Sequence, residues 1–156
     1  MRRRATAALG VLATAVALAG CGGPVSPATA VRRWATEGEF AQSVATLLRD
    51  SASVHHEIAF HRPALNVRTA CDELFNDANY ENTDELTTPD PRLTDLLAAS
   101  YDRFIQAAAR CATHAGDPAV LAGVDAERHR AVGLLIAGVL REEAVAQRSL
   151  KVRGVP

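Results

Sequence analysis

The sequence predicts an all-α protein, an antiparallel up-down bundle of four helices held by one disulfide. Three observations favour this class. Apolar residues recur at intervals of three and four, which is the period of a helix face. Proline and glycine mark where helices begin and end, and two cysteines, Cys71 and Cys111, fall in separate helical segments. Val and Ile seldom alternate with polar residues, so strands are not expected.

The first predicted helix covers about residues 31–61. Its apolar face consists of Phe40, Val44, Leu47, Ser51, Val54 and Ile58. Gly38 is expected to weaken or bend the start of this helix, because glycine is a poor helix former. Pro63 ends the helix, since the residue before a proline disfavours the α conformation, and it can then enter the first turn of the next helix.

The remaining helices are predicted over about 63–80, 91–115 and 118–149. The second carries Val67, Cys71, Leu74 and Ala78 on one face, and the third carries Leu93, Leu97, Tyr101, Phe104, Ala108 and Cys111. Asp90-Pro91 predicts an N-cap with proline at the first helical position. In Gly116-Asp117-Pro118, glycine ends one helix and aspartate caps the next, which Gly123 is expected to loosen. Short connections between the helices favour up-down topology.

The first 20 residues have the organisation of an export signal. Arg2, Arg3 and Arg4 precede the uncharged stretch 5–17, which is too short for a membrane span of about 20 residues. Leu18-Ala19-Gly20-Cys21 resembles the lipobox of bacterial lipoproteins. The resemblance implies that residues 1–20 are removed and that Cys21 is lipidated and becomes the new N-terminus. The alternative is an ordinary secretory signal in which Cys21 is coincidental.

Lipidation of Cys21 would set the location and the partners. A diacylglycerol thioether gives stable membrane anchoring, which predicts a protein on the extracytoplasmic face of the cell membrane. Residues 21–30 are expected to form a flexible tether, and 31–156 a single helical domain. Loss of three arginines leaves 14 basic and 18 acidic residues, a net charge of −4. This balance disfavours nucleic acid as a partner.

With Cys21 lipidated, Cys71 and Cys111 remain in an oxidising compartment, where a disulfide is the default and free thiols are the alternative. The chain-entropy account assigns such a bond about 3–4 kcal/mol. Their wide spacing disfavours a redox or zinc site. Cys71 lies near the middle of its helix and Cys111 near the end of its own. Bonding them requires the third helix to overhang the second by roughly 16 Å, so that residues 81–90 form an ordered, packed loop.

That loop is acidic, and Asp77, Glu81, Asp84, Glu85 and Asp90 are its candidate interaction residues. Two other interpretations stay open. One is a solvated, capped loop. The other is a calcium site, because Asp77, Asn79 and Glu81 alternate as in the opening of an EF-hand loop. The pattern then fails, since Asn82 stands where glycine is needed and Thr88 where a bidentate Glu is needed. No metal is therefore predicted.

Two further features have a structural and a functional interpretation. The five histidines are His55, His56, His61, His114 and His129. They could form a metal site or a pH switch only by tertiary contact. For those near residue 60, placement at the C-terminus of a helix is an equally good explanation. Residues 132–140 carry no charge and are too short to span a bilayer. This run indicates a helix buried on most sides, or one with a face left for a partner.

The segments 69–74, 87–90 and 107–111 together resemble small helical lipoproteins of actinobacteria that have no assigned activity. The resemblance implies an envelope location and a disulfide-linked bundle, with no catalytic residues to transfer. Motifs of hydrolases, phosphate loops and dinucleotide folds are absent, so neither an enzyme nor a cofactor is predicted. The predicted function is a non-enzymatic adaptor that contacts an envelope protein. The alternative is an envelope module that binds or senses a small molecule or metal.

Overall fold

The computed structural model describes residues 25–83 and 87–152, which form five α-helices and no strand. The signal segment 1–20 and Cys21 lie outside the described residues, as do Asp84 and Glu85 of the predicted loop. The predicted all-α class is confirmed. The helices are listed here in chain order: α1 (Pro27–Glu37), α2 (Phe40–Ala59), α3 (Ala64–Thr83), α4 (Pro91–Thr113) and α5 (Pro118–Val152).

The predicted helix over 31–61 is two helices, so the described part of the chain has five where four were expected. The break is at Gly38 and Glu39. Glu39 adopts a left-handed conformation with φ of 50°, which a non-glycine residue rarely takes. Gly38 lies so close to the Trp34 carbonyl that an added Cβ would be 3.1 Å from its oxygen. The glycine thus ends α1 completely, where only a bend was predicted.

The expectation of a flexible tether over 21–30 is wrong for residues 27–30, which are the first turn of α1. Ser26 caps this helix, because its Oγ accepts a hydrogen bond of 3.2 Å from the Thr29 N–H. Pro27 follows at the first helical position, where its fixed φ suits a helix and its missing N–H costs nothing. Ser-Pro in the supposed tether was therefore a helix start.

The other predicted boundaries are close to those observed. Asp90 caps α4 by accepting from the Leu93 N–H at 2.9 Å. Asp117 caps α5 by accepting from the N–H groups of residues 119 and 120. Each aspartate precedes a proline, as predicted. Helix α2 ends two residues early, and His61 takes a φ of 49° before Pro63. Helix α3 extends three residues beyond its predicted end, to Thr83.

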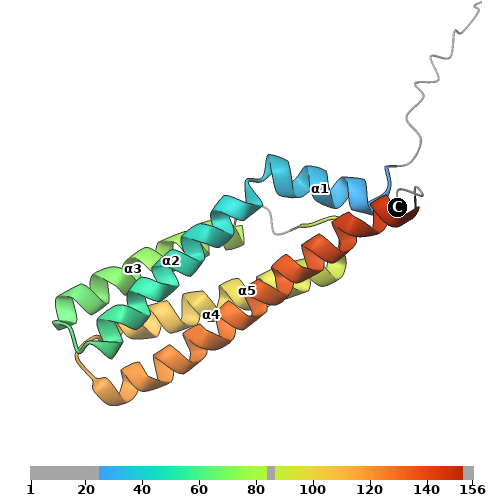
Figure 1. Cartoon of the computed structure of the whole chain (residues 1–156). Coiled ribbons are helices and arrows are strands. Elements are labelled where there is room, and N and C mark those ends of the chain that lie inside the picture. The colour runs from blue at the N-terminus through green and yellow to red at the C-terminus, as the bar shows by residue number, and fades with distance from the viewer. Residues whose placement is uncertain (1–24, 84–86, 153–156) are drawn as a thin grey trace, which may run out of the picture.

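The four longer helices run alongside one another, and α1 lies against the C-terminal part of α5 (Figure 1). Helix α2 contacts α3 and α5, while α4 contacts α3 and α5 on the other side. The shared interior holds the largest fully buried side chains: Phe104, Leu47, Leu74, Leu93, Leu97, Leu135, Val31, Val54, Val67 and Val124. Gly138 allows α5 to approach α4 closely, because a Cβ there would be 2.9 Å from Leu97 Cδ2.

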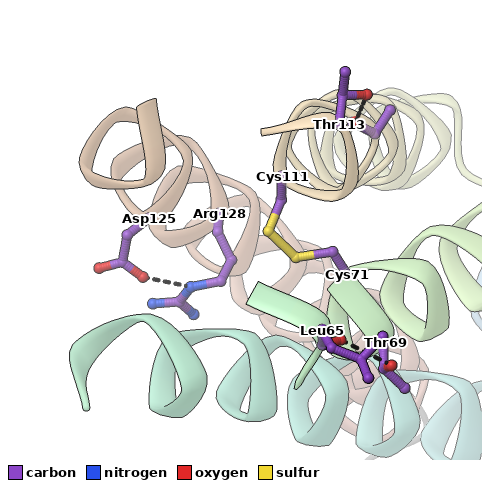
Figure 2. Close-up of a disulfide and its surroundings, with 8 residues drawn as sticks. Leu65, Thr69, Cys71, Cys111, Thr113, Asp125 and Arg128 are labelled. Atoms are coloured by element: carbon purple, nitrogen blue, oxygen red, sulfur yellow. Dashed lines mark hydrogen bonds and ion pairs between the residues drawn. A yellow bond between two sulfur atoms is a disulfide. The ribbon is translucent and has the colours of Figure 1, made fainter. Parts of the chain in front are cut away.

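The predicted disulfide joins Cys71 of α3 to Cys111 of α4, with 6.0 Å between their Cα atoms (Figure 2). Both cysteines are fully buried. Helix α3 continues 12 residues past Cys71, whereas α4 begins 20 residues before Cys111. At 1.5 Å per residue, α4 overhangs the end of α3 by about 12 Å. The overhang places the start of α4 beside the later part of α5, near α1.

Candidate functional site

A cavity of about 540 Å³ opens at the turn between α1 and α2, and we call it the α1–α2 pocket. Residues of α1, α2, α3 and α4 line it, so its walls come from segments that are far apart in the sequence. The lining residues are Trp34, Glu37, Gly38, Glu39, Phe40, Gln42, Ser43, Thr46, Leu47, Asp77, Tyr80, Glu81, Leu97 and Tyr101. Its volume falls within the range of small-molecule sites, about 300–1,000 Å³.

Aromatic rings form much of the apolar wall. Trp34 and Phe40 face each other across the α1–α2 turn, with 5.1 Å between their ring centroids. Phe40 and Tyr101 are buried, whereas Tyr80 is largely exposed. Burial raises the pKa of Tyr101, and the nearby charge of Glu81 raises it further. The Tyr101 hydroxyl therefore stays protonated throughout the physiological range.

The polar lining of the pocket is acidic. Glu37 and Glu39 are exposed at the turn, and Asp77 and Glu81 extend from α3 one helical turn apart. Within the described residues, no Lys, Arg or His lines the pocket. Arg33 pairs with Glu37 at 2.8 Å on the surface of α1, which offsets one of these charges in solvent. The two α3 carboxylates lie deeper, beside the aromatic wall.

Asp77 is coupled to Asp50, a buried residue of α2 that is only 6% exposed. A hydrogen bond with Asp50, together with burial and the charge of Asp50, raises the pKa of Asp77 to about 6. Arg49 pairs with Oδ1 of Asp50 at 3.1 Å. Oδ2 of Asp50 is buried with no donor among the described residues. Two ionised carboxylates cannot hydrogen-bond each other, so this contact favours a proton on Asp77 below about pH 6.

The structure separates the five candidate residues of the acidic loop. Asp77 and Glu81 line the α1–α2 pocket, and Asp84 and Glu85 lie outside the described residues. Asp90 instead forms a two-bonded ion pair with Arg141 of α5, in which Nε–Oδ1 is 3.0 Å and Nη2–Oδ2 is 2.6 Å. Hydrogen bonding to Asp90 raises the pKa of Arg141. Asp90 therefore holds helices together at the start of α4.

The last described residues of the predicted loop are packed against α4. Thr88 is buried, and its hydroxyl donates to the Asp90 carbonyl at 2.7 Å. Its N–H donates to Oγ1 of Thr94 at 3.0 Å. The EF-hand interpretation is not supported, because residues 77, 79 and 81 lie within helix α3. A helix directs alternate side chains to different sides, whereas the calcium loop wraps them around one ion.

The five histidines do not converge. His56 packs on Phe60 with 4.5 Å between ring centroids, and His114 is the C-cap of α4. His55 Nδ1 lies 3.0 Å from Oδ1 of Asp125. Over residues 25–83 and 87–152, no group of three or more His, Cys, Asp or Glu side chains is placed to hold a metal ion.

A buried polar network that the sequence analysis missed joins α2 to α5, close to the disulfide (Figure 2). Arg128, only 8% exposed, donates from Nη1 to Ser51 Oγ at 2.8 Å and from Nε to Asp125 Oδ1 at 2.9 Å. Burial alone would raise the pKa of Asp125, but hydrogen bonds from His55 and Arg128 lower it. The buried Ser51 hydroxyl faces a guanidinium rather than a base, so these residues do not form a nucleophilic triad.

The uncharged run 132–140 is buried on one side only. Leu135 and Gly138 pack inward, whereas Ile136 is 47% exposed and Leu140 is 60% exposed one turn later. The interpretation of a helix buried on most sides is thus wrong for these two residues. Among the helices of the described chain, none is both long and apolar enough to cross a membrane.

Comparisons with known protein families, with curated proteins and with solved structures find no match. The geometry of the molecule is therefore the only guide to its site. The α1–α2 pocket unites residues from both groups that sequence analysis treated separately, the acidic loop and the apolar helix faces. Trp34 and Asp50 were not singled out by any sequence pattern. Gly38, which the sequence analysis expected to weaken or bend a helix, marks the α1–α2 turn where the pocket opens.

Proposed function

We propose that this protein is a lipid-anchored module on the extracytoplasmic face of the membrane, and that it binds a small molecule in the α1–α2 pocket. The pocket is the observation that carries the proposal. It has a suitable volume, a mostly aromatic wall and a few polar groups at defined places, which are the usual properties of a ligand site. No covalent chemistry is assigned to it. This is the alternative that the sequence left open, with the adaptor role as the second candidate.

The proposed anchor is Cys21, acylated within the lipobox 18–21. Because α1 begins at Pro27, only residues 22–26 separate the anchor from the folded domain. Six peptide steps reach at most about 20 Å. The domain would thus stay next to the lipid surface, where it meets molecules that cross or leave the membrane.

We also propose that α2, α3, α4 and α5 form an antiparallel up-down bundle, with α1 as an additional short helix. The ring of contacts among these four helices supports this arrangement, as do the brief connections 60–63 and 114–117. In such a bundle, the pocket lies at one end, where α1 leads from the start of α2 to the C-terminal part of α5.

The adaptor role remains as the second candidate because of one observation. Ile136 and Leu140 are exposed one turn apart on α5, the run that the sequence analysis selected as a possible contact surface. Cross-linking in intact cells tests it. Capture of one specific envelope protein that is lost in an Ile136→Asp, Leu140→Asp variant would support the adaptor. Unchanged capture in that variant would contradict it.

The binding function can be tested with a pair of tryptophan substitutions. Ser43 lines the pocket, so Ser43→Trp fills it, whereas Ala45 is exposed on the same helix outside the lining, so Ala45→Trp is the control. The full lipoprotein is extracted in a non-ionic detergent and screened against a small-molecule library by ligand-observed NMR. We expect ligands that bind the wild type and Ala45→Trp but not Ser43→Trp. Equal binding by all three would refute the assignment of this pocket.

A further inference from the structure

The composition of the α1–α2 pocket sets the charge of what it can hold. Four carboxylates and no basic side chain are among the described residues that line it, although Arg33 outside the lining pairs with Glu37. Ligands with a phosphate or carboxylate group would meet like charge there. A ligand that carries a positive charge gains attraction from Asp77 and Glu81, which lie one turn apart on α3.

The aromatic wall favours an organic cation over a metal ion. The faces of Trp34, Phe40, Tyr80 and Tyr101 carry negative potential, which attracts ammonium groups and also contacts their alkyl substituents. Metal ions instead need several oxygen or nitrogen ligands at short distance. No group of three such ligands exists among the described residues.

Asp50 adds an observation that does not depend on the lining. Its side chain is buried and acts on the pKa of Asp77, and its Oδ2 atom has no hydrogen-bond partner among the described residues. A buried carboxylate without a full set of donors is costly. Arg49 compensates only Oδ1 from an exposed position. A cation bound against Asp77 would add positive charge close to this buried carboxylate pair.

We infer that the α1–α2 pocket binds a small organic ammonium cation, with its charge against Asp77 and Glu81 and its alkyl groups against Trp34 and Phe40. This inference rests on the proposed function and names the ligand class for the same pocket. Below about pH 6, where Asp77 holds a proton, a bound cation has to displace that proton, so binding weakens as the pH falls. The groups that act on Asp77 are Asp50 and Arg49 from α2 and Glu81 from α3 itself.

The test uses a matched pair of probes, choline and its neutral isostere 3,3-dimethyl-1-butanol. Dissociation constants are measured by ligand-observed NMR on the detergent-extracted lipoprotein. We expect choline to bind at least tenfold more tightly than the alcohol at pH 7.5. We expect choline affinity to fall at least threefold at pH 5, where Asp77 is mostly protonated, with no change for the alcohol. Phosphocholine should bind more weakly than choline, which separates a free cation from a phosphate-bearing headgroup.

Two variants locate the effect. Asp77→Asn should lower choline affinity at least fivefold and remove its pH dependence. Asp72→Asn, which changes an exposed carboxylate of α3 outside the pocket, should leave the affinity and its pH dependence unchanged.

Equal affinity for choline and the alcohol, with both lost in Ser43→Trp, would overturn the cation inference and leave the proposed function standing. Binding of either probe that persists in Ser43→Trp would overturn both. Absence of choline binding at about 10 mM, a concentration that detects even weak binding, would overturn the cation inference alone.

Discussion

Arg141 and Asp90 bind each other through two hydrogen bonds across 51 residues of sequence, and Asp90 at the same time caps helix α4. The Asp90 carboxylate thus accepts hydrogen bonds from the Leu93 N–H and from Nε and Nη2 of the Arg141 guanidinium. This arrangement attaches the overhanging start of α4 to α5. It also explains why Asp90, selected from sequence as a loop contact residue, faces another helix.

Substitutions at Asp90 should separate its two roles. Asp90→Asn keeps a good N-cap but loses the charge, whereas Asp90→Ala loses both. We expect Asp90→Ala to be less stable than Asp90→Asn by about 1 kcal/mol, the usual value of an N-cap. Arg141→Met should destabilise the wild type but not Asp90→Ala. Urea unfolding followed by circular dichroism measures the wild type, the three single variants and the Asp90→Ala, Arg141→Met double variant. An equal effect of Arg141→Met in both backgrounds would argue against the pair.

Two glycines of α5 should respond in opposite directions to alanine. A Cβ at Gly138 would be 2.9 Å from buried Leu97, so Gly138→Ala should destabilise the fold by about 1–3 kcal/mol through overpacking. Gly133 has open space around it, so Gly133→Ala should stabilise the helix by about 0.5–1 kcal/mol. Thermal unfolding midpoints compare the two variants directly. Stabilisation by both would show that α4 and α5 are not in close contact at Leu97.

The disulfide should behave as one unit. Cys71→Ser and Cys111→Ser should each destabilise the domain by about 3–4 kcal/mol, and the double variant should lose no more than either single variant. Denaturant unfolding of the three proteins, with mass spectrometry to count free thiols, gives the answer. Clearly additive losses would contradict a bond between the two cysteines.

Removal of Arg128 should be costly because two partners lose a donor at once. Arg128→Met leaves the Ser51 hydroxyl and the Asp125 carboxylate without their guanidinium contacts, and we expect a loss of about 2–3 kcal/mol. Arg130, which lies two residues further along α5 and is exposed, is the control, since its ion pair with Glu127 lies in solvent. Arg130→Met should change stability by less than about 0.5 kcal/mol. Similar losses in both variants would argue against the buried network.

Asp77 and Asp125 should change the stability of the protein in opposite directions as the pH rises. Asp77 has a raised pKa of about 6, so the native state binds more protons than the unfolded state between about pH 4 and 6. Its contribution therefore weakens as the pH rises through that window. Asp77→Asn should stabilise the protein at pH 7 and flatten this part of the curve.

Asp125 has a lowered pKa, so its contribution is present above about pH 4 and is lost as the pH falls further. Asp125→Asn should therefore destabilise the protein at pH 7 and have little effect at pH 2.5. Unfolding curves from pH 2.5 to 7.5, taken as differences from the wild type, give the contribution of each aspartate, which for Asp125 includes its contact with His55. Matching differences at both ends of the range would contradict the assignment for either aspartate.

The fold was largely predictable because local signals agree with tertiary packing in α3, α4 and α5. Asp90-Pro91 and Asp117-Pro118 define helix starts by chemistry that does not depend on the rest of the chain. The break between α1 and α2 was less predictable. The periodic apolar face begins only at Phe40, after Gly38, and the packing of α1 against α5 is what shows that residues 31–37 belong to a separate helix.

The site was predictable only in part. Asp77 and Glu81 stood out because they are acidic neighbours, but their partners could not be found from sequence. Trp34 reaches the pocket through the packing of α1, and Tyr101 through the pairing of α4 with α3, which are both long-range features. Ser51 gave an unused signal, since a hydroxyl within an otherwise apolar helix face indicates a buried polar partner.

The position of α1 also fixes which way the molecule would point from a lipid surface. Pro27 begins α1 beside the later part of α5, and α5 covers 35 residues, or about 50 Å. With Cys21 acylated as proposed, that end faces the bilayer. The turn at 114–117 and the nearby disulfide then stand at the distal tip. An epitope tag inserted at Gly116 should therefore bind antibody on intact spheroplasts. The ligand would enter the α1–α2 pocket from the side of the domain nearer the membrane.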